Sequence, residues 1–369
     1  ILSGEKSEQL EMTSKLKNNF DLTEKRQSIK EQKLVSVLLN KNFPILVAKE
    51  IVDLVPYKPG KPISETKREY GLSEVTKLAS NENPIGTSPK VFQAIQNALS
   101  EIHRYPDASC YELLQQASKY FQVKPEQILV GNGSNELIDL IIRVVCQAGD
   151  SIFIAEKSFL AYAISAQSAR VNVINYPLQS GFVTDLKGMA DYLKTNAEKE
   201  NIKVVFVPNP NNPTGIYNSA DQVENFLKIT SQIPNLLVVF DEAYHEFVRA
   251  TDYRSALEFQ GQFPNVVVLR TMSKAFGLAG LRIGFMIADP KINDLIHRIR
   301  NPFNINELAQ VAAVAAFQDI DFVKKSAQVT WEGLDYFYAQ LKEMNISYTP
   351  SEGNFVLIDT GAEVTETYE

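Results

Sequence analysis

The sequence contains few of the residues that build disulfide frameworks and histidine-rich metal sites. Its 369 residues include two cysteines, Cys110 and Cys146, and three histidines, His103, His245 and His297. Two cysteines cannot make a disulfide scaffold or a multi-cysteine zinc site, and three dispersed histidines argue against a zinc site built mainly of imidazoles. We therefore expect a globular protein without a bound metal.

The sequence also lacks an excess of positive charge and a long apolar run. It has 37 lysines and arginines against 44 aspartates and glutamates, a net charge of -7, which argues against a general nucleic-acid or anionic-membrane binder. No apolar run reaches the roughly 18 residues of a membrane helix, and no apolar signal segment opens the chain. We expect a protein that binds neither nucleic acid nor membranes. The cytoplasm is its default location, with an organellar leader as the alternative.

The distribution of polar and apolar residues predicts four segments. Hydrophobic residues make up 44% of the sequence, enough for a substantial core, and the length suggests two domains. Residues 1–50 are polar and rich in lysine and glutamate, and we expect an extension there. Residues 51–77 include the run PYKPGKP, whose prolines favour an extended arm. Residues 78–300 then form a large domain, and residues 301–369 a smaller one.

The apolar runs of residues 78–300 predict an α/β fold. KVVFV, LLVVF and VVVLR are apolar on both faces, which is typical of parallel strands covered by helices on each side. We predict strands at 127–130, 151–155, 171–175, 203–207, 236–240 and 266–269, and helices at 91–102, 112–121 and 136–146. In the small domain we predict helices at 307–318 and 322–344 and a strand at 354–359.

The first candidate site is a glycine loop, because ligands of open parallel sheets bind at the carboxyl ends of strands. Residues 131–136 (GNGSNE) follow a predicted strand and begin a predicted helix, so their free N–H groups suit a phosphate. The loop lacks the lysine and Ser/Thr of a P-loop, and Glu136 replaces the third glycine of the dinucleotide fingerprint. A plain turn, a phosphate site and a dinucleotide site all stay open for it.

Three further strand ends carry side chains that could position a ligand or react with it. Residues 208–215 (PNPNNPTG) combine rigid prolines with asparagine amides, or form only a stiff surface turn. Asp241 follows an apolar strand, where a carboxylate is costly unless it meets a cation or caps a helix. Lys274 lies among small and apolar residues, where burial would lower its pKa and make the amine nucleophilic. The alternative for Lys274 is an ordinary solvated lysine.

Taken together, these residue types match the requirements of pyridoxal phosphate. Lys274 offers an amine for a Schiff base, Asp241 can keep the pyridine nitrogen protonated, and the glycine loop can hold the phosphate. Ser273 and Arg282 are candidates for further phosphate ligands. Tyr244 and Asn212 could hydrogen-bond the phenolic oxygen of the cofactor, and Phe159 could stack on its ring.

Six motifs resemble those of histidinol-phosphate aminotransferases, which are fold-type I pyridoxal-phosphate enzymes with an aspartate-aminotransferase-like fold. They are LASNENPIG at 78–86, RYPD at 104–107, GNGSNE at 131–136, PNNPTG at 210–215, DEAYHEF at 241–247 and RTMSKAFGLAGLRIG at 270–284. The resemblance covers residues 50–369, and the motifs occur in family order. Aromatic-amino-acid transaminases and a threonine-phosphate decarboxylase share much of the pattern.

The resemblance implies an aminotransferase of histidine biosynthesis. Such an enzyme moves an amino group between histidinol phosphate, or imidazole-acetol phosphate in reverse, and glutamate or 2-oxoglutarate. An aromatic-amino-acid transaminase is the alternative within the same chemistry. A non-catalytic dinucleotide-binding module is the alternative from another class, which the carboxylate of Glu136 disfavours.

The resemblance also implies a role for each matching residue, and a homodimer as the active form. Lys274, Asp241 and Tyr244 would be catalytic, and Tyr57 and Asn83 would contact substrate, Tyr57 by reaching into the partner's site. The cofactor would be bound by Gly133, Ser134, Asn135, Phe159, Asn212, Asp241, Tyr244, Ser273, Lys274 and Arg282, and by Tyr105 from the partner subunit.

Four features depart from the family pattern. Lys157 and Ser158 precede Phe159, where the family usually has proline and threonine, and Asn135 stands where aspartate is common. About 45 residues precede the usual start of the family. The C-terminal arginines that bind the substrate's phosphate and carboxylate have no counterpart before Glu369, so the resemblance implies that the small domain at 301–369 is incomplete. We therefore expect this chain to bind the cofactor, and treat turnover as a separate question.

Overall fold

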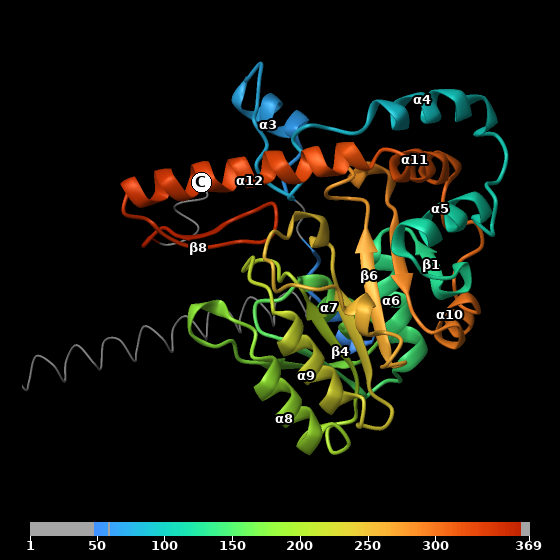
Figure 1. Ribbon diagram of the computed structural model, residues 1–369, viewed down its shortest axis with the longest axis vertical. Helices are drawn as coiled ribbons and strands as arrows, with labels where there is room; N and C mark the ends of the chain where they lie inside the picture. The colour runs from blue at the N-terminus through green and yellow to red at the C-terminus, as the bar shows by residue number, and fades with distance from the viewer. Residues whose placement is uncertain (1–47, 58–59, 363–369) are drawn as a thin grey trace, which may run out of the picture. The chain divides into compact units, whose positions relative to one another are not determined.

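The computed structural model describes residues 48–57 and 60–362 (Figure 1). Apart from its last three residues, the expected N-terminal extension at 1–50 lies outside the described residues. The chain divides into two compact units, Ile1–Val55 and Pro56–Glu369. Helix α2, Lys49–Val52, belongs to the first unit, and everything below concerns the second.

A seven-stranded sheet forms the centre of the second unit. Its order is β1-β7-β6-β5-β4-β2-β3, and β7 alone runs against the other six strands. The strands are β1 (Ile128–Gly131), β2 (Ser151–Ala155), β3 (Asn172–Tyr176), β4 (Ile202–Pro208), β5 (Leu237–Asp241), β6 (Val266–Thr271) and β7 (Gly284–Ile287). The expected α/β fold with a mostly parallel sheet is confirmed. Because β4, β5 and β6 are parallel neighbours, their carboxyl ends meet at one edge.

Helices cover both faces of this sheet, as the doubly apolar strands require. Alternate side chains of a strand point to opposite faces. On β5, Val239 packs in the cluster with α6 (Ser134–Val145), α7 (Leu160–Ser168) and α10 (Pro290–His297). Its neighbours Val238 and Phe240 pack in the cluster with α8 (Leu186–Asn196) and α9 (Ala220–Thr230) (Figure 1). Each fully buried side chain of this kind stabilises the fold by about 1.5–3 kcal/mol.

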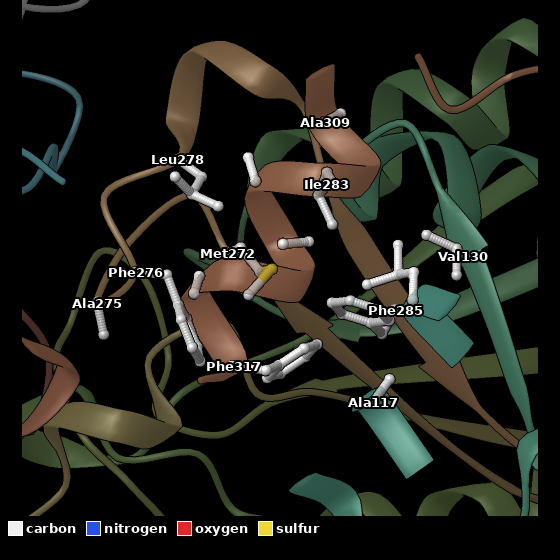
Figure 2. Packing of buried hydrophobic residues seen from close by; sticks show 14 of the residues in the cluster. Ala117, Val130, Met272, Ala275, Phe276, Leu278, Ile283, Phe285, Ala309 and Phe317 are labelled. Atoms are coloured by element: carbon white, nitrogen blue, oxygen red, sulfur yellow. The ribbon is translucent and has the colours of Figure 1, made fainter. Parts of the chain in front are cut away.

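A third apolar cluster anchors the segment that follows β6. Met272, Phe276 and Leu278 pack against Phe317 and Ala309 of α11 (Figure 2). The cluster also draws on helices that flank it: α4 (Pro89–Ala98), α5 (Tyr111–Phe121), α11 (Glu307–Phe317) and α12 (Ile320–Glu343). The apolar neighbours of Lys274 in the sequence therefore hold its loop in place.

Several elements differ from the sequence-based expectation. Helix α3, Ile63–Tyr70, interrupts the segment 51–77 that we expected to be extended; it starts after Pro62 and ends at Gly71, whose φ of 64° suits glycine. The strand expected at 354–359 is only β9, Leu357–Asp359, and it pairs antiparallel with β8, Ser347–Thr349.

Helices α7, α8, α9 and α10 and strand β7 were not predicted at all. Among the residues that the structure describes, no helix is long and apolar enough to cross a membrane.

Candidate active site

A cleft of about 450 Å³ opens at the carboxyl ends of β4, β5 and β6. This volume is typical of small-molecule sites, which run from about 300 to 1,000 Å³. The cleft is lined by Tyr57, Ser80, Asn81, Glu82, Ser134, Asn135, Phe159, Tyr162, Pro208, Pro210, Asn212, Asp241, Ala243, Tyr244, Thr271, Ser273, Lys274, Ala279 and Arg282. Most of the residues singled out in the sequence thus meet in one place.

The amine of Lys274 lies near the carbonyl oxygen of Ser80 and interacts with the charges of Glu82, Arg282 and Asp241. Its Nζ donates a hydrogen bond of 2.9 Å to the carbonyl oxygen of Ser80. Burial lowers the pKa of Lys274 to about 8; the negative charge of Glu82 opposes this shift, and the positive charge of Arg282 adds to it. A larger fraction of this amine is neutral at pH 7 than for an exposed lysine, and the neutral amine is the nucleophile.

Asp241, the last residue of β5, presents a buried carboxylate to the cleft. Its Oδ2 accepts a 2.8 Å hydrogen bond from the hydroxyl of Tyr162, and its Oδ1 accepts one of 3.2 Å from the backbone N–H of Ala243. Burial raises the pKa of Asp241 to about 6, and these hydrogen bonds and the charge of Lys274 oppose the rise. At neutral pH the carboxylate is ionised and can pair with a cationic ring nitrogen.

The hydroxyl of Tyr244 accepts two amide hydrogen bonds. Nδ2 of Asn81 donates to it over 3.0 Å and Nδ2 of Asn212 over 2.9 Å. Burial raises the pKa of Tyr244 to about 12, so the phenol keeps its proton at neutral pH. With two donors already bound, that proton is available to an acceptor in the cleft, such as a phenolic oxygen.

The start of helix α6 forms a cradle beside Arg282. Gly133 precedes the helix with a φ of 78°, and a Cβ built there would lie 2.3 Å from Nη2 of Arg282. Nη1 of Arg282 donates to the hydroxyl of Ser273 over 3.3 Å, and Ser134 and Asn135 line the same wall. Free helical N–H groups, hydroxyls and a guanidinium fit a phosphate.

The carboxylate of Glu136 turns back onto its own loop. Its Oε2 accepts from the backbone N–H of Asn132 over 2.6 Å and from Nδ2 of Asn304 over 2.7 Å. Glu136 does not line the cleft. The carboxylate therefore orders the phosphate cradle by tying its first residue to the helix.

Three of the expected site residues do not line the cleft: Gly133, which precedes the cradle wall, and Tyr105 and Asn83. Tyr57 lies there in an unexpected way. Tyr105 is 82% exposed and stacks on Phe303, with ring centroids 4.7 Å apart. Nδ2 of Asn83 donates to the carbonyl oxygen of Ala275 over 3.0 Å and to the hydroxyl of Ser326 over 2.8 Å. Tyr57 lines the cleft of its own chain, whereas the resemblance implies that it reaches a partner's site.

Sequence analysis missed several contributors to the cleft, among them Glu82, whose charge acts on Lys274. Ser80 and Asn81 lie within the motif LASNENPIG, but nothing in the sequence indicates that they meet Lys274 and Tyr244. Tyr162 lies on α7, which was not predicted. The carbonyl oxygen of Asn81 also accepts from Nδ2 of Asn354 over 3.0 Å, so the segment between β8 and β9 contacts this wall of the site.

Known proteins resemble the chain over most of its length. The family model described as aminotransferase class I and II matches residues 73–368. A histidinol-phosphate aminotransferase of Bdellovibrio bacteriovorus is 52% identical over 314 residues, which cover 85% of this chain and 84% of the relative.

Solved structures agree with this resemblance. The crystal structure of histidinol-phosphate aminotransferase from Sinorhizobium meliloti in complex with pyridoxal-5'-phosphate matches with a TM-score of 0.79 and 26% identity, over 89% of this chain and 86% of that one. Aspartate aminotransferase from Thermus thermophilus with maleate, at 18% identity and a TM-score of 0.75 over 86% of each chain, shares the fold.

Proposed function

Because the chain belongs to the class I and II aminotransferase family, we propose that it exchanges an amino group between histidinol phosphate and 2-oxoglutarate, in histidine biosynthesis. The chain is a pyridoxal-phosphate-dependent aminotransferase. The observation that carries the substrate assignment is the 52% identity to a relative named histidinol-phosphate aminotransferase, supported by a cleft lined by a lysine, a buried carboxylate, a phenol and a guanidinium.

Bound pyridoxal phosphate supplies an aldehyde that joins to amines and a ring that withdraws electrons from the adjacent carbon. Lys274 would hold the cofactor through its amine, since it lies in the cleft and its pKa is lowered to about 8. Asp241, ionised at neutral pH, would pair with the ring nitrogen and keep it protonated. Phe159 lines the wall where it can stack on the ring.

The remaining polar groups orient the cofactor and move protons. Tyr244, held by Asn81 and Asn212, would donate a hydrogen bond to the cofactor's phenolic oxygen. The cradle of Gly133, Ser134 and Asn135, with Ser273 and Arg282, would hold its phosphate. The amine of Lys274 would serve as the base that moves a proton in either direction, because its pKa lies near the working pH.

We also propose that the active form is a homodimer. Tyr105 is exposed and does not line the cleft of its own chain, and its role as a ligand of the cofactor phosphate in a partner subunit is part of this proposal. Tyr57 contacts substrate from the wall that it lines, in its own chain or in the partner's. Asn83 acts on substrate only indirectly in this arrangement, since its amide is engaged by Ala275 and Ser326.

The decisive experiment follows cofactor attachment and substrate preference in the purified protein. Addition of pyridoxal phosphate should produce a visible absorbance band and, after borohydride reduction, a mass increase on the peptide that contains Lys274. The Lys274→Ala variant should show neither. Absence of the band in the wild-type protein would refute the assignment.

The substrate is tested by comparing rates with histidinol phosphate and with phenylalanine, each with 2-oxoglutarate as acceptor. A higher kcat/KM for histidinol phosphate supports the proposal, and the reverse order supports an aromatic-amino-acid transaminase. Titration with NAD tests the dinucleotide alternative, and we expect no saturable binding in the cleft.

A further inference from the structure

Tyr162 is a fully buried phenol whose hydroxyl points at the carboxylate of Asp241. Its relative exposure is 0%, and its ring stacks on Phe206 with centroids 4.7 Å apart. The hydroxyl donates to Oδ2 of Asp241 over 2.8 Å. Ring packing thus fixes the direction of this hydrogen bond, since the phenol cannot turn away without leaving its stack.

Helix α7 places two aromatic side chains around the expected cofactor ring. Phe159, the residue before the helix, and Tyr162 both line the cleft and contact each other edge to face at 5.8 Å. Phe159 lies where a ring would stack, and Tyr162 lies beside the carboxylate that would meet the ring nitrogen. Helix α7 therefore positions one side chain for the flat face of the cofactor ring and another beside the carboxylate at the ring's nitrogen.

The charged and titratable groups around Asp241 leave the phenol as its closest side-chain partner. Lys274, beyond the end of β6, affects the carboxylate through its charge and makes no hydrogen bond to it in the described residues. Glu242, next in sequence, pairs with Arg270. Tyr244 donates no bond to Asp241 and is held by Asn81 and Asn212. Among the described residues, the other donor to the carboxylate is the backbone N–H of Ala243.

We propose that Tyr162 is a positioning residue that orients the Asp241 carboxylate toward the cofactor's ring nitrogen and keeps that carboxylate ionised. The inference rests on the cofactor assignment above. A donor fixed on Oδ2 and a backbone N–H on Oδ1 hold the carboxylate plane, so a free lone pair can face the cleft. The ring nitrogen then meets a charged, oriented acceptor instead of a neutral acid.

The test compares two ligands that differ at the ring nitrogen. Pyridoxal phosphate and its analogue with carbon in place of that nitrogen are titrated into cofactor-free wild-type and Tyr162→Phe proteins, and dissociation constants are measured by absorbance and fluorescence. A hydrogen bond to a charged group is lost, so we expect the variant to bind pyridoxal phosphate about tenfold or more weakly. Affinity for the analogue should change less than about twofold, because the analogue makes no bond to Asp241.

The pH dependence gives a second readout that a role in packing would not move. Removal of the donor raises the pKa of Asp241, so the loss of pyridoxal-phosphate affinity on acidification should begin at a higher pH in Tyr162→Phe. Tyr162→3-fluorotyrosine, a more acidic phenol and stronger donor, should shift the loss to lower pH. This second variant also tests the proposal if Tyr162→Phe proves unstable.

Tyr192→Phe is the matched control. Tyr192 also donates to a carboxylate, that of Glu200 at 2.8 Å, and also stacks on a phenylalanine, Phe153, but it lies away from the cleft. It should leave both affinities unchanged. Equal losses for the two ligands, or no loss for either, would overturn the role of Tyr162. A wild-type protein without the visible band would instead refute the cofactor assignment.

Discussion

Substitution Glu82→Gln should accelerate attachment of pyridoxal phosphate to Lys274 at neutral pH. Glu82 lines the cleft, and its charge is the largest influence that raises the pKa of Lys274 against the lowering by burial. Loss of that charge leaves burial and Arg282 less opposed, so the pKa falls below about 8. More of the amine is then neutral, and only the neutral amine attacks the aldehyde.

The size of the effect follows from the titration. At pH 7 an amine with a pKa of about 8 is neutral roughly once in 11 molecules, against roughly once in 3,000 for a lysine with the ordinary value of 10.5. The pocket itself therefore supplies a gain of about 300-fold. Glu82 is partly exposed and paired with Lys77 at 2.7 Å, so its share is that of a screened charge pair, about 0.2–1 kcal/mol. That share lowers the pKa by about 0.15–0.7 unit, which raises the neutral fraction at pH 7 by about 1.4- to fourfold.

Stopped-flow absorbance of the cofactor-free protein, at low cofactor concentration and from pH 6 to 10, measures the attachment rate. Glu224→Gln is the matched control, because this glutamate also pairs with a lysine, Lys228 at 2.8 Å, on helix α9 away from the cleft. The wild-type rate should rise with pH to a midpoint near 8. A midpoint near 10, or a slower reaction of Glu82→Gln than of wild type at pH 7, would refute the reasoning.

Three further predictions address the cradle, the buried charges and the ring-nitrogen carboxylate. Gly133→Ala should weaken pyridoxal-phosphate binding by at least about tenfold in equilibrium titration, with an unchanged far-ultraviolet spectrum. The new Cβ would lie 2.3 Å from Nη2 of Arg282, and the φ of 78° disfavours alanine. An unchanged affinity would contradict the proposal that this cradle binds the phosphate. Glu242→Gln should destabilise the protein by about 1.5–3 kcal/mol in urea unfolding, since buried Arg270 would keep only its longer pair with Glu246 at 3.4 Å. Asp335→Asn, which breaks the exposed pair with Arg249, should leave the midpoint nearly unchanged; equal effects would show that burial is not the cause. Acidification below about pH 6 should weaken cofactor binding, because Asp241, ionised above its raised pKa, becomes protonated there, and Asp241→Asn should bind weakly without this dependence; a flat wild-type profile would count against the pairing.

The sequence predicted the parts of the site that depend on strand order and missed the parts that depend on long-range contacts. Asn212, Asp241 and Lys274 each follow an apolar strand, and β4, β5 and β6 are parallel neighbours, so their ends had to meet. Ser80 and Asn81 enter the cleft from a segment nearly 200 residues away from Lys274 in sequence, and no periodicity encodes that approach.

Strand β7 and helix α7 were missed for local reasons. Strand β7 begins at Gly284, which interrupts the apolar pattern of the sequence. A Cβ at this position would lie 2.4 Å from the backbone nitrogen of Ser134, so only glycine allows the phosphate cradle to pack against the strand. Helix α7 mixes alanine and serine with apolar residues and has no clear apolar face. Tyr162 therefore carried no signal in the sequence.

The neighbouring carboxylates Asp241 and Glu242 have different partners: Glu242 binds Arg270, whereas Asp241 faces the cleft. Glu242 is fully buried and is held by Arg270, by the hydroxyl of Ser255 at 2.6 Å and by the backbone N–H of Ala256 at 2.6 Å. Arg270 belongs to β6, four residues before Lys274, so this ion pair ties the end of β5 to the strand that carries the reactive amine.

Because Glu242 pairs with Arg270 and does not line the cleft, the carboxylate at the end of β5 that faces the cleft is that of Asp241. The same ion pair fixes the separation of Asp241 and Lys274 before a ligand arrives, so little reorganisation is needed when the ring binds between them. On this reasoning Glu242→Gln should lower cofactor affinity as well as stability, and a stabilising substitution elsewhere should restore the stability without restoring the affinity.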